Sequence, residues 1–83
     1  MARVKVYGAD WCVMTQSTLS HLNDRGITYD YVDIDEDRKA AQWVAQHNGG
    51  KEKKPTLDID GLILSTPSNS EIDQALASKK ISE

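Results

Sequence analysis

The chain begins with an alternation of hydrophobic and polar residues over positions 3–7, Arg-Val-Lys-Val-Tyr, which predicts a half-buried β-strand. Residues 28–34 alternate in the same way and predict a second strand. Two shorter apolar segments, 57–59 and 62–64, flank the turn sequence Asp60-Gly61 and predict a hairpin. The pattern therefore predicts four strands.

Three other segments carry helical signals. We expect one helix from about Trp11 to Arg25, with Gly26 as its C-terminal stop. A second helix follows the acidic residues 35–37, which suit a helix N-terminus, and ends at the two glycines 49–50. A third begins at residues 68–71, Ser-Asn-Ser-Glu, which have the spacing of a capping box. The expected inward-facing residues are Leu19 and Leu22, some of Ala40, Trp43, Val44 and His47, and Ile72, Ala75 and Leu76.

The order of these elements implies a right-handed βαβ unit followed by a hairpin and a helix. We therefore expect an α/β fold, a four-stranded mixed sheet flanked by three helices that cover both faces. Because the chain has only 83 residues, it makes a single domain, residues 1–83, whose stability depends on good packing.

Composition narrows the classes of function. The apolar fraction of 39% and the charged fraction of 28% are typical of a soluble globular protein. No apolar run approaches the ~20 residues of a membrane span, and the N-terminus lacks a secretory apolar region, so we expect a cytoplasmic protein that does not bind a membrane. The net charge of −3 argues against nucleic acid as a partner.

Cys12 is the only cysteine, which excludes an internal disulfide and fits a reducing compartment. It lies where the first strand meets the first helix, and a helix N-terminus favours a thiolate. The hydroxyl of Thr15, one helical turn later, could donate to that thiolate. Asp10 is a like charge that would raise the pKa of Cys12 unless it caps the helix. In the alternative interpretation Cys12 is a small buried hydrophobe and Thr15 fills space.

Other chemistries fit less well. Residues 33–37 resemble the start of a calcium loop, but Arg38 and Val44 stand at its sixth and twelfth positions, where glycine and glutamate are required. One cysteine and two separated histidines do not make a zinc site, so we expect no metal. His21 is expected to be a packing or surface residue. The lysine-rich residues 51–54 are either a solvated loop or an anion-binding segment.

Several motifs occur together in an order and spacing that resemble the glutaredoxin branch of the thioredoxin superfamily. These are a strand, then Trp11-Cys12-Val13-Met14-Thr15, a helix closed by Gly26, the strand residues 27–35, Lys54-Pro55-Thr56 and Asp60-Gly61. The resemblance covers residues 3–77 and implies a thioredoxin/glutaredoxin-like fold.

The resemblance also implies roles for individual residues. Cys12 would be the nucleophile that attacks the sulfur of a glutathione mixed disulfide, with Thr15 beside it. Pro55 would be a cis-proline, so that the backbone of Lys54 could pair with a peptide-like substrate. The remaining substrate-binding residues that the resemblance implies are Trp11, Ser68, Asn69 and Ser70, the last three through hydroxyls and backbone N–H groups that would meet a carboxylate.

The leading hypothesis is thus a monothiol-type thiol–disulfide oxidoreductase. Its co-substrate would be glutathione or another low-molecular-weight thiol, with no tightly bound cofactor. Its partners would be disulfide-bearing or glutathionylated proteins, and we expect a monomer. One alternative is a non-enzymatic module that binds a protein or peptide beside Cys12 and Pro55. Another is an iron–sulfur cluster carrier, although residues 13–15 are not the Gly-Phe-Ser of iron–sulfur monothiol glutaredoxins.

Overall fold

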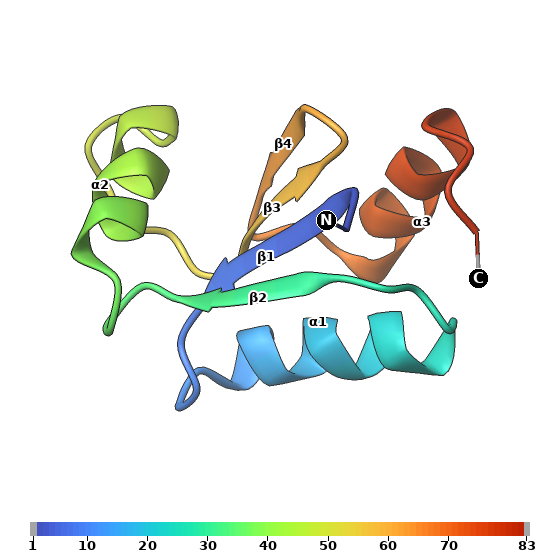
Figure 1. Ribbon diagram of the computed structural model, residues 1–83, viewed down its shortest axis with the longest axis horizontal. Coiled ribbons are helices and arrows are strands. Elements are labelled where there is room, and N and C mark those ends of the chain that lie inside the picture. Colours follow the sequence, from blue (N-terminus) through green and yellow to red (C-terminus); the bar gives the residue numbers. More distant parts are fainter. Residues whose placement is uncertain (1, 83) are drawn as a thin grey trace.

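The computed structural model describes residues 2–82 and contains a four-stranded sheet with the strand order β2-β1-β3-β4. Figure 1 shows the sheet between three helices. The elements, in chain order, are β1 (Val4–Gly8), α1 (Val13–Asp24), β2 (Asp30–Asp33), α2 (Arg38–His47), β3 (Thr56–Ile59), β4 (Leu62–Ser65) and α3 (Asn69–Ser78). The predicted mixed sheet with three helices is therefore confirmed.

The central strand β1 pairs on both sides. It runs parallel to β2, with Gly8 opposite Asp33, and antiparallel to β3, with Tyr7 opposite Thr56. β3 and β4 form the predicted antiparallel hairpin, with Ile59 opposite Leu62 around the Asp-Gly turn. The C-terminal end of β1 therefore lies beside the end of β2 and the start of β3.

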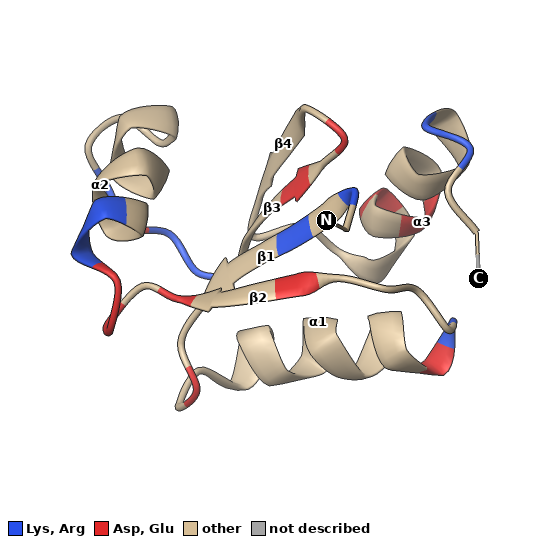
Figure 2. Ribbon diagram, viewed as in Figure 1, with Lys and Arg blue, Asp and Glu red and all other residues tan. Residues whose placement is uncertain are grey.

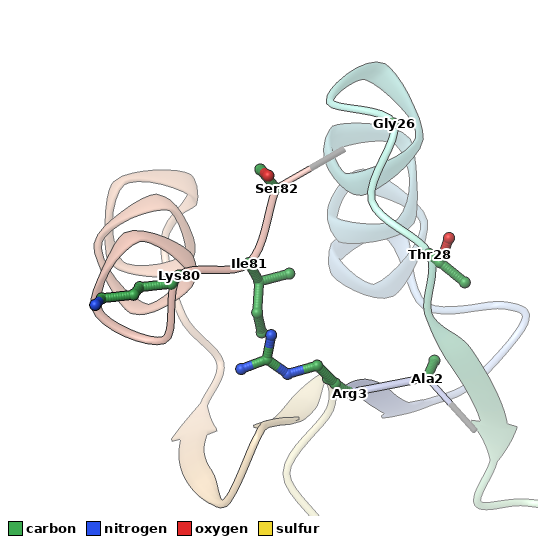
Figure 3. A pocket seen from close by; sticks show the side chains of 7 residues that line it. All are labelled: Ala2, Arg3, Gly26, Thr28, Lys80, Ile81 and Ser82. Atoms are coloured by element: carbon green, nitrogen blue, oxygen red, sulfur yellow. The ribbon is translucent and has the colours of Figure 1, made fainter.

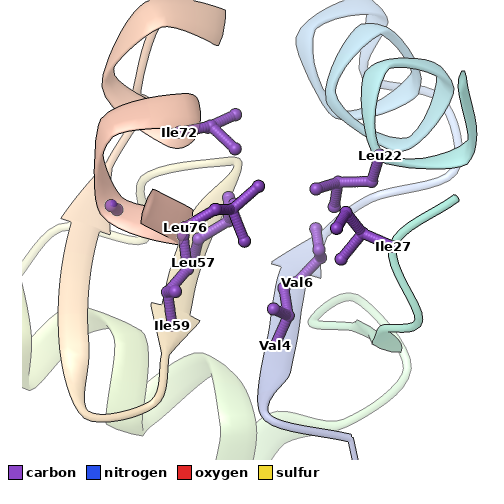
Figure 4. Close-up of a cluster of buried hydrophobic side chains, with 9 residues drawn as sticks. Val4, Val6, Leu22, Ile27, Leu57, Ile59, Ile72 and Leu76 are labelled. Atoms are coloured by element: carbon purple, nitrogen blue, oxygen red, sulfur yellow. The ribbon is translucent and has the colours of Figure 1, made fainter. Parts of the chain in front are cut away.

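Alternation along β1 divides the hydrophobic residues between the two faces of the sheet. Val4 and Val6 join Leu57 and Ile59 of β3 on one face. Figure 4 shows this cluster between the sheet and side chains of α1 and α3, and its helical members are Leu22, Ile72, Ala75 and Leu76. Tyr7 points to the other face, where Ile34 packs with Ala41 and Val44 of α2. Helices thus cover both faces, as the sequence predicts.

The predicted element bounds differ most from the observed ones at two places. α1 begins at Val13 rather than near Trp11, because Cys12 has an extended backbone (φ −82°, ψ 120°) and occupies the N-cap position. β2 begins at Asp30 rather than Thr28, because its pairing with β1 starts at the Lys5–Asp30 pair.

The start of α3 agrees with its predicted capping box. The Ser68 hydroxyl accepts the backbone N–H of Glu71 at 3.1 Å, and the Glu71 carboxylate accepts the Ser68 N–H at 2.9 Å. Among the helices of residues 2–82, none has the length and apolar character that crossing a bilayer requires.

A polar cluster joins α1 to α3 at the edge of the larger hydrophobic cluster. Asp73 of α3 accepts Arg25 Nη1 at 2.6 Å and lies 2.7 Å from His21 Nε2, and both contacts use the same carboxylate oxygen. The hydrogen bonds from His21 and then Arg25 lower the pKa of Asp73 below its ordinary value. α1 buries only Thr15, Thr18 and Leu22, so this cluster adds to a sparse apolar contact.

We predict that Asp73→Asn lowers the free energy of unfolding by about 0.2–1 kcal/mol near neutral pH, the range of exposed ion pairs. A carboxylate whose pKa is depressed in the folded state stabilises the fold fully above its unfolded pKa of ~3.9. That contribution is lost as the pH falls through the folded pKa. Urea denaturation at a series of pH values should therefore show the two proteins converging in acid.

Asp24→Asn is the matched control, because it removes the same charge from an exposed position in the last turn of α1. It should not lower the free energy of unfolding. Equal losses for the two variants would mean that the Asp73 cluster contributes no specific stabilisation.

Candidate active site around Cys12

Three connecting segments meet at the C-terminal end of β1. The first is the β1–α1 loop with Cys12, and the second is the turn after β2, where the Ile34 N–H donates to the Gly8 carbonyl at 2.9 Å. The third is the segment before β3, which enters the sheet at Thr56 beside Tyr7. Figure 2 shows the lysine-bearing segment before β3 reaching the end of β1, with acidic residues in the loops that follow β1 and β2. The site therefore has lysines on one side, before β3, and acidic residues on the other, after β1 and β2.

Cys12 is partly exposed at the start of α1. Burial of its thiol raises the pKa, but the Thr15 hydroxyl, the backbone N–H groups of Thr15 and Met14, and the Lys54 ammonium lower it more. The net pKa therefore lies below the ordinary value. The sulfur makes no side-chain capping hydrogen bond of regular geometry, so these donors act as electrostatic neighbours of the thiolate.

Thr15 is fully buried and contacts Ala9 and Gly8 as well as Cys12. Its hydroxyl oxygen accepts the backbone N–H of Ala9 at 3.4 Å. Its side chain also rests on Gly8, where an added Cβ would lie only 2.5 Å from Thr15 Oγ1 and Cγ2. Thr15 thus fills space, as one interpretation held, and also presents a hydroxyl to Cys12, as the other held.

Trp11 and Lys54 are brought together next to Cys12. The indole of Trp11 is 69% exposed, and its N–H donates to Asp35 Oδ2 at 2.6 Å. The Lys54 ammonium lies 4.8 Å from the centroid of the Trp11 ring, within the range of a cation–π contact. The Lys54–Pro55 bond is cis, as the resemblance implied, and the Pro55 carbonyl accepts the Thr66 N–H at 2.8 Å.

The N-terminus of α3 is partly occupied by its own cap. Both the N–H and the hydroxyl of Ser68 are bonded to Glu71. Asn69 and Ser70 are exposed, and first-turn N–H groups have no intrahelical acceptor. Asn69 and Ser70 therefore have open backbone N–H donors, whereas Ser68 has only its hydroxyl proton left to donate.

Asp10 does not cap α1, since Cys12 occupies the N-cap position. Its carboxylate accepts the Tyr31 hydroxyl at 2.7 Å, and it is not among the groups that shift the pKa of Cys12. Burial and then the bond to Asp10 raise the pKa of Tyr31, so the phenol keeps its proton. The Asp10 carboxylate is thus bonded to the Tyr31 hydroxyl rather than to the N-terminus of α1.

Sequence reasoning missed Tyr31 and Asp35 as neighbours of the site. Tyr31 occupies a strand position, and Asp35 belongs to an acidic run that is typical of a helix start. The only available signal was the topology, because a parallel β1–β2 pair brings the residues after β2 next to the residues after β1.

The other concave features lie elsewhere. A pocket of ≈ 300 Å³ is formed by the start of β1, the loop after α1 and residues 80–82 (Figure 3). Arg3, which lines this pocket, precedes β1, whereas Cys12 follows it, so the pocket and the thiol lie at opposite ends of the strand. Within residues 2–82, no group of three or more His, Cys, Asp or Glu side chains is placed to hold a metal ion.

Comparison with known proteins identifies the family. The family model described as Glutaredoxin matches residues 4–64, which include Cys12, Thr15 and Pro55. The chain belongs to the glutaredoxin family. It is therefore a redox protein of the kind that acts on thiols and disulfides.

Individual relatives agree with this assignment. Mycoredoxin 1 of Corynebacterium glutamicum is 36% identical over 73 residues, which are 87% of this chain and 90% of the relative. The crystal structure of a glutaredoxin from Archaeoglobus fulgidus superposes with a TM-score of 0.80 at 21% identity, over 92% of this chain and 87% of the other. The glutaredoxin-like NrdH-redoxin of Escherichia coli superposes with a TM-score of 0.73 at 21% identity, over 86% and 91%. The two structures share the fold.

We predict that Thr15→Val raises the pKa of Cys12 by about one unit, because a hydrogen-bond donor to the charged form is lost. The pH dependence of alkylation by iodoacetamide measures this pKa. Thr15→Ser is the matched control, since it keeps the hydroxyl and should keep the pKa close to that of the parent. If the valine variant titrates like the parent, Thr15 acts only by packing.

We also predict that Gly8→Ala raises the pKa of Cys12, because its methyl group would displace the Thr15 side chain. Such overpacking should lower the free energy of unfolding by about 1–3 kcal/mol. Adding Thr15→Ala makes room for the methyl group, so the double variant should be more stable than the sum of the two losses predicts. Strict additivity would show that Gly8 and Thr15 do not constrain each other.

Proposed function

We propose that this protein is a monothiol-type thiol–disulfide oxidoreductase in which Cys12 is the nucleophile. Its co-substrate is glutathione or another low-molecular-weight thiol, and its substrates are proteins that carry a mixed disulfide with that thiol. It works as a monomer in a reducing compartment, the cytoplasm, without a tightly bound cofactor. The single observation that carries the proposal is the partly exposed Cys12 thiol at the start of α1, with its pKa lowered by Thr15, Met14 and Lys54.

The reaction needs two thiol–disulfide exchanges. In the first, the Cys12 thiolate attacks the small-thiol sulfur of the mixed disulfide, so a bond from Cys12 to the small thiol forms and the protein thiolate leaves. In the second, a free small thiolate attacks the sulfur of the Cys12-bound small thiol, and the Cys12 thiolate leaves. The protein thiol is thus released in its reduced form, and one free small thiol joins the small thiol of the mixed disulfide in a small-thiol disulfide. One cysteine is sufficient for this route, and the chain has one.

The groups around Cys12 suit a thiol that also carries carboxylates. The charge of the Lys54 ammonium lowers the pKa of the Cys12 thiol. We assign pairing with a peptide-like substrate to the backbone of Lys54, which precedes the buried Pro55. The open N–H groups of Asn69 and Ser70 are the donors that we assign to a substrate carboxylate.

We predict that incubation with oxidised glutathione gives a single mixed disulfide on the parent protein and none on Cys12→Ser. Intact-mass analysis across a pH series measures both the adduct and its rate. Because the thiolate is the nucleophile, the rate should rise with pH and be half-maximal at a pH below the free-cysteine pKa of ~8.5. Serine is nearly isosteric, so the variant should retain the parent's urea denaturation midpoint.

Two results would contradict this function. One is a native Cys12 that resists alkylation at about neutral pH, and the other is a serine variant with a large loss of stability. Either would identify Cys12 as a packing residue. Adduct formation with a different small thiol but not with glutathione would keep the chemistry and change the co-substrate.

A second candidate function is supported by the apolar surface beside the thiol. Trp11, Val13 and Met14 are 69%, 81% and 52% exposed, although all three are large and hydrophobic. Such a surface favours a module that docks a protein or peptide at the start of α1 without redox turnover. A partner that binds Cys12→Ser as tightly as the parent would support this candidate over the oxidoreductase.

A further inference from the structure

Trp11 is a mostly exposed aromatic side chain whose position is nevertheless fixed. It lies in the loop between β1 and α1 and belongs to neither hydrophobic cluster. Within residues 2–82, the hydrogen bond of its side chain is the 2.6 Å bond from the indole N–H to Asp35 Oδ2. The ring orientation therefore depends on Asp35 rather than on packing.

Asp35 is itself held by the turn that follows β2. Its backbone N–H donates to Asp33 Oδ1 at 2.9 Å, and the Asp37 N–H donates to the Asp33 carbonyl at 3.0 Å. Asp33 pairs with Gly8 at the end of β1. The carboxylate that holds the indole is thus connected to the same strand end from which the Cys12 loop departs.

The Trp11 ring also contacts Lys54. The ammonium lies 4.8 Å from the ring centroid, and a cation over an aromatic face is attracted by the ring quadrupole. A lysine side chain has four rotatable carbons and would otherwise move freely at a partly exposed position. The ring therefore gives the ammonium a preferred place near the thiol.

We propose that Asp35 is a positioning residue for the Cys12 site: its carboxylate holds the Trp11 indole, and the indole face holds the Lys54 ammonium beside the sulfur. Asp35 thereby favours the thiolate even though it carries the same charge as the thiolate. This inference deepens the proposed function. Only the benefit to disulfide exchange rests on that function, because thiolate formation is measured without any disulfide substrate.

The charged groups near the thiol determine in which direction the pKa of Cys12 should change when Asp35 is replaced. Lys54 favours the thiolate, Asp10 is bonded to Tyr31, and Asp33 is bonded to the Asp35 backbone. Through space alone, the Asp35 carboxylate repels the thiolate, and removing it should lower the pKa of Cys12. Through Trp11 and Lys54, removing it should raise that pKa. The two routes therefore predict opposite outcomes.

The test compares Asp35→Asn with Asp35→Ala. Asparagine removes the charge but keeps a side-chain oxygen that can accept the indole N–H, so the pKa of Cys12 should equal that of the parent or fall slightly. Alanine removes both, and the pKa should lie about half a unit above that of the asparagine variant, a threefold lower thiolate fraction well below the pKa. Iodoacetamide alkylation rates across pH measure both. An alanine variant at or below the asparagine variant would overturn the proposal.

Lys54→Met tests whether Asp35 acts on Cys12 through Lys54. In that background the alanine and asparagine variants should have the same Cys12 pKa, because no ammonium remains to be positioned. A difference that persists without Lys54 would also overturn the proposal. If Asp35→Ala fails to fold, Trp11→Phe replaces it: phenylalanine has no N–H for Asp35, and the pKa should rise relative to the parent, whereas an unchanged pKa would count against us.

A second readout follows the ring itself. The chain has two tryptophans, so a Trp43→Phe background leaves Trp11 as the only one. In this background, Asp35→Ala should shorten the fluorescence anisotropy decay of Trp11 relative to Asp35→Asn. Equal decays would show that Asp35 does not hold the indole. These outcomes are independent of the proposed turnover, since a parent protein that forms no glutathione adduct can still show the predicted order of pKa values.

Discussion

The two-sided pairing of β1 is the constraint on which the candidate site depends. A parallel neighbour ends at the same edge as β1, and an antiparallel neighbour begins there. The residues after β1, those after β2 and those before β3 are therefore brought together, although Cys12, Asp35 and Lys54 are far apart in sequence. Neither α1 nor the lysine-rich segment could form this site alone. The strand order thus determines which residues surround Cys12.

Alternation along the strands, together with the capping and glycine signals of the helices, was sufficient to predict the elements, because all of them pack on a single sheet. The capping box at Ser68 and the Asp60-Gly61 hairpin were readable since their bonds form between residues close in sequence. Element ends were less predictable. Where α1 starts depends on the turn in which the Cys12 N–H donates to the Ala9 carbonyl at 3.0 Å, which no helix signal encodes.

Within the site, the sequence indicated Cys12 and Thr15, and the family resemblance indicated Pro55 and its cis bond. The contacts that tune the thiol were not predictable, because they join residues through tertiary packing. Asp10 shows the difference: its charge predicted repulsion, whereas in the fold its carboxylate is bonded to Tyr31. Likewise the charge of Asp35 gives no indication of its bond to Trp11.

The electrostatic support of the Cys12 thiolate has a second consequence, for the departure of Cys12 rather than its attack. A thiol with a lowered pKa is a better leaving group, so any mixed disulfide on Cys12 is opened faster than one on an ordinary cysteine. In the proposed reaction, the adduct therefore forms with oxidised small thiol alone and is short-lived once free small thiol is present. In the function proposed above, Thr15, Met14 and Lys54 would thus shorten the lifetime of the adduct as well as favour its formation.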